Sequence, residues 1–118
     1  MLIRENFSVA RGNDIVVDLD IGPDVASLIG TNITWRAYQQ FCGIPYGDPV
    51  ITKNLDAGLQ ISDPDLQLVL ITLDRADTID LDLGNYWHEA SIDDTSAKHT
   101  TVTEGIMTLV RAENPVLT

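Results

Sequence analysis

Apolar and polar residues alternate along much of this chain, in short runs that end at turn-forming residues. Residues 14–21 place four aliphatic side chains on one face and three aspartates on the other, with Val16 as the exception. In residues 32–38, Ile33, Trp35 and Ala37 share a face. A period of two indicates a β-strand with one face buried. The pattern therefore predicts strands rather than helices.

Similar runs recur at roughly ten-residue intervals, each closed by Gly, Pro, Asp or Asn. The further strands predicted from these runs cover residues 6–9, 50–54, 59–62, 66–73, 86–92 and 99–111. Residues 50–54 and 59–62 flank "LDAG", which predicts either a hairpin or two successive strands. Residues 66–73 are apolar on both faces, as expected of a central strand that meets little solvent.

Glycine and proline mark the predicted breaks between these strands. Residues 22–32 are expected to form a loop, with a brief turn at residues 24–28. The stretch "GIPYGDP", residues 43–49, holds two Gly and two Pro and predicts a break in the chain. Asp74 is suited to cap a short helical turn, and residues 92–97 are expected to form a hairpin loop.

The last predicted strand contains an interior glycine, Gly105. Such a glycine predicts a β-bulge, which would let Val102 share a face with Met107 and Leu109. With this strand the chain has seven or eight short strands and almost no helix, which leaves a β-sandwich or a small barrel.

The segment "DLGNY", from Asp82 to Tyr86, narrows this choice. In immunoglobulin-like sandwiches a Tyr near the start of strand F sends its hydroxyl to a backbone group upstream. Asp82, Gly84 and Tyr86 have that spacing. His88 stands where antibody domains carry a Cys, and Trp35 stands where strand C keeps its Trp. We therefore predict an all-β, antiparallel immunoglobulin-like sandwich with Greek-key connections and no disulfide.

The order of these motifs resembles the small immunoglobulin-like domains of tailed-phage and prophage virion proteins, such as the N-terminal sandwich of baseplate upper proteins. The resemblance runs from Phe7 to Arg111. The residues that carry it are Trp35, Lys53, Asp77, Thr78, Gly84, Tyr86, Glu89, Thr101 and Gly105. The resemblance implies that these residues are scaffold, and that the protein is a non-enzymatic component of a tail, baseplate or head-tail region with protein partners.

Composition adds limits on partners and compartment. The chain has 118 residues, which predicts one domain with a core of about residues 7–111 and a short tail at 112–118. Its net charge is −11, with 14 Asp and 4 Glu against 7 Lys and Arg, so neither nucleic acid nor a membrane is expected as a partner. Cys42 is the one cysteine. No secretory signal opens the chain, so synthesis in the cytoplasm is expected, with the virion as destination after assembly.

Candidate chemistry is sparse. Asp80, Asp82 and Gly84 resemble part of a calcium loop, although Gly84 replaces a ligand and no Glu closes the loop. Ordinary strand-edge aspartates are the simpler interpretation, and the alternative is a calcium- or carbohydrate-binding adhesion-type sandwich. The aspartates that could join such a site from other loop ends are Asp18, Asp20, Asp24, Asp63 and Asp65.

No hydrolase elbow, phosphate loop, zinc-protease motif or dinucleotide motif occurs, so we predict no enzyme activity and assign no catalytic, cofactor or metal residue. His88 is expected in the core and His99 at the surface. The structural residues predicted are Trp35, Gly84, Tyr86, His88 and Gly105.

Aromatic side chains are the stronger indication of binding. Tyr38, Tyr46 and Trp87 fall on predicted outer faces or loops, and aromatic residues are enriched at interface hot spots. These three residues are the candidate interaction surface. The alternative is that a neighbouring loop of the same chain covers Trp87. If a protein partner covers the surface, a closed homo-oligomer is the natural geometry for a virion component.

Overall fold

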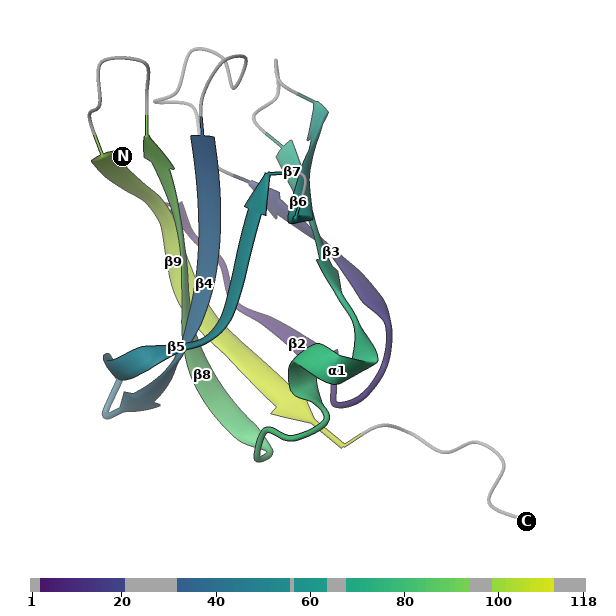
Figure 1. Cartoon of the computed structure of the whole chain (residues 1–118). Coiled ribbons are helices and arrows are strands. Elements are labelled where there is room, and N and C mark those ends of the chain that lie inside the picture. Colours follow the sequence, from purple (N-terminus) through teal and green to yellow (C-terminus); the bar gives the residue numbers. More distant parts are fainter. Residues whose placement is uncertain (1–2, 21–31, 56, 64–67, 94–98, 112–118) are drawn as a thin grey trace.

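The structure is a computed structural model that describes residues 3–20, 32–55, 57–63, 68–93 and 99–111 (Figure 1). These residues form nine strands and one short helix. The elements are β1 (Ile3–Arg4), β2 (Phe7–Ala10), β3 (Ile15–Asp20), β4 (Asn32–Phe41), β5 (Ile44–Leu55), β6 (Gly58–Asp63), β7 (Leu68–Leu73), α1 (Arg75–Thr78), β8 (Gly84–Asp93) and β9 (His99–Val110).

The strands form two facing layers (Figure 1). One layer has β1 and β2 beside β9, followed by β8, β4 and β5, and the other has β6, β7 and β3. β1 and β2 run parallel to β9, while the neighbours within the rest of each layer are antiparallel. A short parallel contact between β5 and β6 joins the layers along one side. This order is that of an immunoglobulin-like sandwich, which confirms the predicted fold class.

The core lies between the layers and is almost entirely apolar. Ile33, Trp35 and Ala37 are fully buried on the inner face of β4, as the alternation predicted. The largest other apolar side chains that are fully buried are Leu19, Leu59, Val69, Ile71, Leu73, Met107 and Leu109. Burying a side chain of this size stabilises a fold by roughly 1.5 to 3 kcal/mol relative to leaving it in water. With no disulfide, this burial holds the layers together.

The predicted break at residues 43–49 is wrong. β4 continues to Phe41 and β5 begins at Ile44, so only Cys42 and Gly43 form the turn. Both have positive φ, 54° and 79°, as a two-residue type I′ hairpin turn requires. The prolines are tolerated because, in the described part of the chain, β5 pairs with β4 on one side and meets β6 only at its C-terminal end.

Three other strand predictions change in detail. β7 is central between β6 and β3, but it is not dry on both sides, because Thr72 is exposed and Leu70 is half-buried. β5 and β6 are two successive strands rather than a hairpin, since Asn54 and Leu55 pair in parallel with Gly58 and Leu59. The N-terminal strand β1 was not predicted, because two residues are too few to show alternation.

The bulge in β9 lies at Val102 and not at Gly105. Ala90 of β8 pairs with Thr103 and the next residue, Ser91, pairs with Thr101, so β9 has one extra residue between them. Gly105 pairs in regular register with His88. The consequence that we expected still holds, because Val102 is buried together with Met107 and Leu109.

Several predictions fall outside the described residues. They are the loop at residues 22–31 with its turn at 24–28, residues 94–97 of the hairpin loop, residues 66–67 of the strand predicted at 66–73, and the tail at 112–118.

The connection from β7 to β8 contains the predicted tyrosine corner. The Tyr86 hydroxyl donates a hydrogen bond to the backbone carbonyl of Asp82, at 2.7 Å. Burial raises the pKa of Tyr86, and the nearby Asp82 carboxylate raises it further. Gly84, between the two, has a φ of 136°, which L residues other than glycine rarely adopt. The predicted corner is therefore confirmed at the level of the hydrogen bond.

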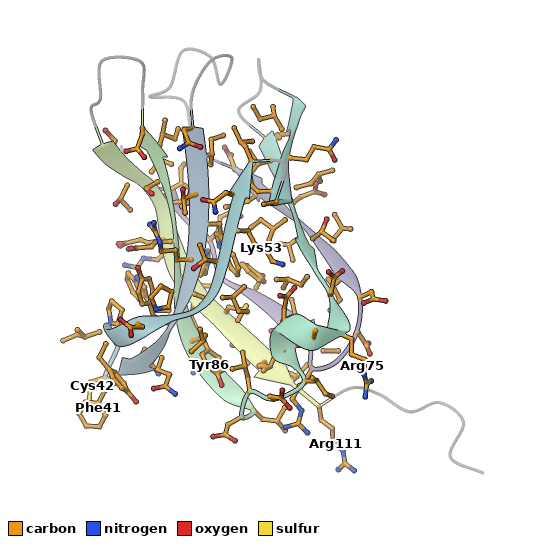
Figure 2. The ribbon with its side chains drawn as sticks, viewed as in Figure 1. Phe41, Cys42, Lys53, Arg75, Tyr86 and Arg111 are labelled. Carbon is orange, nitrogen blue, oxygen red and sulfur yellow. The ribbon has the colours of Figure 1, made fainter. Side chains whose placement is uncertain are left out.

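The connection from β7 to β8 is also tied to β5, through α1. Asp74 is the residue before the helix, as predicted, and its backbone N–H donates to the carboxylate of Asp77 at 2.7 Å. Lys53 reaches from β5 toward α1, and its Nζ lies 2.7 Å from the same Asp77 oxygen (Figure 2). One carboxylate thus closes the helical turn and links it to β5.

Replacing Tyr86 by Phe should lower the free energy of unfolding by about 1 kcal/mol, because the Asp82 carbonyl loses its hydroxyl donor while the ring still fills the same space. Urea denaturation measures the change. Tyr46→Phe is the matched control, since that ring lies half-exposed on another strand. Equal stability of Tyr86→Phe and the unchanged protein would show that the corner bond contributes nothing.

Candidate interaction surface

The β4–β5 hairpin leaves the sandwich at an irregularity in its pairing. Ala37 pairs with Ile51 and Gln39 pairs with Tyr46, so residues 47–50 of β5 stand opposite Tyr38 alone. The surplus chain on one strand bends a hairpin locally. β8 accompanies β4 only as far as Gln39. The end of the hairpin therefore projects from the body of the molecule (Figure 1).

The projecting end, residues 39–47, is here called the hairpin tip. Its apolar side chains face solvent: Phe41 is 74% exposed, Ile44 66% and Tyr46 52%. These three line a shallow hollow of about 430 Å³. Phe41 and Cys42 lie at the far end of the projection (Figure 2). Apolar side chains that gather in this way, rather than singly, form a candidate surface for a protein partner.

The hairpin tip is also uncharged. None of its nine residues is Asp, Glu, Lys or Arg, although the chain carries a net charge of −11. The prediction from sequence had included Tyr46 and missed Phe41 and Ile44. The signal was present, because "FCGI" places two apolar residues around a pair that ends in Gly, a common hairpin turn arrangement. The nearby prolines led to the opposite interpretation.

The candidate surface of Tyr38, Tyr46 and Trp87 divides into two parts. Tyr38 and Trp87 pair across β4 and β8 on the outer face of their layer, while Tyr46 belongs to the hairpin tip. The expected exposure of Trp87 is wrong, since only 9% of it reaches solvent. Its neighbours across the sheet, Tyr38 and Ile106, lie on the adjacent strands of the same layer and contribute to this burial.

Trp87 and Tyr38 also lie close to a polar neighbour, Glu89. Trp87 Nε1 donates to the Glu89 carboxylate at 3.5 Å. The pKa of Tyr38 is raised, first by its partial burial and then by the neighbouring Glu89 carboxylate. Tyr38 is half-buried. Of the three predicted residues, Tyr46 is therefore the one that stands clearly in solvent.

His88 occupies the centre of the core as predicted and is fully buried. The Trp35 indole Nε1–H donates to its Nδ1 at 3.1 Å, so the ring proton is on Nε2. That Nε2–H donates to the backbone carbonyl of Glu5 at 2.6 Å. Phe7 packs against the same imidazole, with ring centroids 4.8 Å apart. Both nitrogens of a neutral ring are thus satisfied.

The arrangement lowers the pKa of His88. Burial disfavours the charged imidazolium and outweighs the opposing effect of the Glu5 carbonyl. A second proton on Nδ1 would also face the Trp35 donor, and their hydrogen bond would be lost. The ring is therefore held neutral, in one tautomer, and has no free nitrogen with which to bind a metal or transfer a proton.

Glycine is required at position 105 by the contact between His88 and the Glu5 carbonyl. Glu5 and Asn6 pass over Gly105 and Ile106, where Glu5 N–H donates to the Glu104 carbonyl and Asn6 Oδ1 accepts from Ile106 N–H. A Cβ at position 105 would lie deep inside van der Waals contact with the Glu5 carbonyl oxygen. Glycine is needed here for the close approach of two backbones and not for a bulge.

The described residues contain no group of three or more His, Cys, Asp or Glu that could hold a metal ion. Asp24 and Asp65 lie outside them, as do the side chains of Asp63 and His99. The calcium-binding hypothesis thus stays a prediction. Within the same described part of the chain, no helix is long and apolar enough to cross a bilayer.

No protein-family model and no curated protein matches the chain. Seventeen chains of solved structures do. One belongs to the ZIG-8–RIG-5 IG1–IG1 heterodimer, with 18% identity and a TM-score of 0.41 over 94% of this chain and 84% of that one. A likeness with this TM-score carries no argument about the fold or the function of this chain.

Acidification should destabilise the protein through His88. Because its pKa is below 6.5 in the folded state and near 6.5 when unfolded, the unfolded chain binds the proton first as the pH falls. Stability is therefore complete above pH 6.5 and declines below it, by at most about 1.4 kcal/mol per pH unit, until the folded pKa is reached.

Urea denaturation between about pH 7.5 and pH 5.5 measures this dependence, above the range in which most carboxylates titrate. His88→Gln keeps one donor and one acceptor but cannot gain a charge, and it should flatten the profile. Val16→Ser removes an exposed residue that does not titrate, and it should leave the profile unchanged. An unaltered slope in His88→Gln would rule out His88 as the titrating group.

Gly105→Ala should lower the free energy of unfolding by about 2 to 3 kcal/mol, because the added methyl group overlaps the Glu5 backbone and displaces the acceptor of His88. Thr101→Ala, at an exposed position of the same strand, should change stability by less than about 0.5 kcal/mol. Thermal or urea unfolding distinguishes the two. Equal effects would mean that the N-terminal segment does not pack tightly over β9.

Proposed function

We propose that this protein is a non-enzymatic structural or assembly protein of a phage or prophage virion, in the tail, baseplate or head-tail region, and that it acts through protein-protein contacts. It is made in the cytoplasm and incorporated into the particle. The virion assignment is supported by the resemblance of its sequence motifs to virion immunoglobulin-like domains. The mode of action is supported by the hairpin tip.

The observation that carries the proposal is an exposed apolar cluster on a projecting, uncharged hairpin. Phe41, Ile44 and Tyr46 stay in solvent. In contrast, the core buries nearly all the large apolar side chains on the inner faces of the two layers. Exposed apolar area of this kind favours association, by roughly 25 cal/mol for each Å² removed from water. A partner surface supplies the burial that this chain does not.

Contacts at the hairpin tip are made by side chains and not by added strands. Pro45 and Pro49 have no backbone N–H to offer along the outer edge of β5, and prolines on an edge strand block pairing with a further strand. Gly47, between them, has a φ of 75°, which also departs from regular strand geometry. The hairpin therefore exposes an apolar end, while its prolines keep a further strand from pairing with the edge of β5.

The negative charge of the chain affects when copies of it associate. A net charge of −11 makes free copies repel one another and stay in solution until they meet the correct surface. Docking then depends on the uncharged hairpin tip. Such a protein assembles by surface complementarity and needs no catalytic group, cofactor or metal.

The proposal is tested in particles from a host that carries this gene. Mass spectrometry of purified virions should detect the chain at a fixed ratio to the major structural proteins. Replacing Phe41 and Ile44 together by Ser should reduce its incorporation at least tenfold, because most of the apolar contact area is removed.

Val16→Ser is the matched control, since Val16 is 59% exposed but lies on β3, in the other layer. It should be incorporated like the unchanged protein. Particles that lack the unchanged chain would refute the virion role, and full incorporation of the Phe41 and Ile44 double variant would refute the role of the hairpin tip.

A further inference from the structure

The geometry points to a second copy of this chain as the partner of the hairpin tip: two hairpins pack end to end about a two-fold axis, each Phe41 ring entering the hollow of the other. This inference rests on the proposed function in naming the partner of the same surface. It identifies the first contact from which a larger assembly is built.

Charge is the first argument. Two copies that meet face to face bring together surfaces with a combined excess of carboxylates, and like charges placed opposite each other across an interface are strongly unfavourable. Residues 39–47 carry no charge, and they project from the body. Contact through the hairpin tips therefore joins two acidic molecules while their charged bodies stay apart. A basic partner would have no carboxylate to recognise there.

Shape is the second argument. A two-fold contact uses the same patch twice, so the patch must offer both a protrusion and a depression. The hairpin tip has both, since the Phe41 ring is 74% exposed and the hollow beside it is lined by Phe41, Ile44 and Tyr46. The hollow, at about 430 Å³, has room for an aromatic ring.

Area sets the strength of the contact. Two partly exposed aromatic rings and one Ile offer on the order of 300 Å² from each copy. A stable interface buries roughly 1,200 to 2,000 Å² in total, so a contact between tips alone is weak and forms at high protein concentration. Weak pairing of this kind suits a subunit that must stay free in the cytoplasm and associate when many copies are held together.

Cys42 provides a direct readout. It is exposed in the turn between Phe41 and Ile44, at the outermost point of the hairpin. In the proposed pair the two Cys42 thiols lie close to the two-fold axis. A short bis-maleimide, which adds to both thiols, should then join two chains much faster than random collision allows.

Sedimentation equilibrium up to about 1 mM protein measures the pairing directly, over the range where contacts of this size are expected to form. We expect a monomer-dimer equilibrium that tightens as salt is raised from about 0.05 to 0.5 M, because salt screens repulsion between the acidic bodies. Phe41→Ser should weaken dimerisation at least tenfold. Val16→Ser, with an equally exposed apolar residue on the other layer, should not change it.

Cross-linking distinguishes a specific dimer from nonspecific association. The control protein carries Cys42→Ser and Val16→Cys, so that its one thiol is exposed on β3 instead. Cross-linking through Cys42 should exceed cross-linking in this control at least tenfold, and Phe41→Ser should abolish the difference. A monomer at all concentrations and salts, or equal cross-linking from both thiol positions, would overturn the inference.

The two proposals fail in different ways. If the protein stays monomeric but the Phe41 and Ile44 double variant is lost from particles, a second copy is not the partner and the proposed function remains. If the protein dimerises through Cys42 proximity but never enters particles, the pairing stands and the virion role falls.

Discussion

The fold depends on a neutral imidazole that is hydrogen-bonded on both sides within the core. His88 accepts from Trp35 on β4 and donates to the carbonyl of Glu5 on the N-terminal segment, at 3.1 and 2.6 Å. Gly105 leaves room for that carbonyl to approach. Three separate parts of the chain meet β8 at this ring. A buried polar group without partners is costly, so these segments must all be in place for the core to be stable.

Antibody domains have a disulfide in the core, and this chain has the His88 hydrogen bonds instead. The two kinds of link connect different parts of the fold. A disulfide joins the two layers, whereas the His88 hydrogen bonds join β8 to β4 and to the N-terminal segment of the same layer. The layers are held by apolar burial and by peripheral bonds, such as the Lys53–Asp77 ion pair. The core can therefore form in a reducing compartment, but it becomes sensitive to acid, because protonating His88 on Nδ1 breaks its hydrogen bond with Trp35.

In this architecture, the residues that stabilise the fold are separate from those of the proposed contact surface. The polar and aromatic groups of the predicted site are used internally: His88 in the core, Tyr86 at the corner, and Trp87 buried on the outer face of its layer. The cluster of apolar side chains that remains in solvent lies on a hairpin that extends past the sandwich. Its bend comes from surplus residues in β5, and its apolar end carries no charge. The proposed binding surface is therefore the projection, while the sandwich holds it in place.

Local pattern predicted most of the strands and the corner. Alternation predicted the buried face of β4, and the spacing of Asp82, Gly84 and Tyr86 predicted a hydrogen bond that the structure contains, because both depend on residues close in sequence. The role of Gly105, the cover of Trp87 and the exposure of Phe41 were decided by tertiary structure. Each depends on which distant backbone or side chain lies opposite, such as Glu5 over Gly105. Neighbours along the chain do not specify that register.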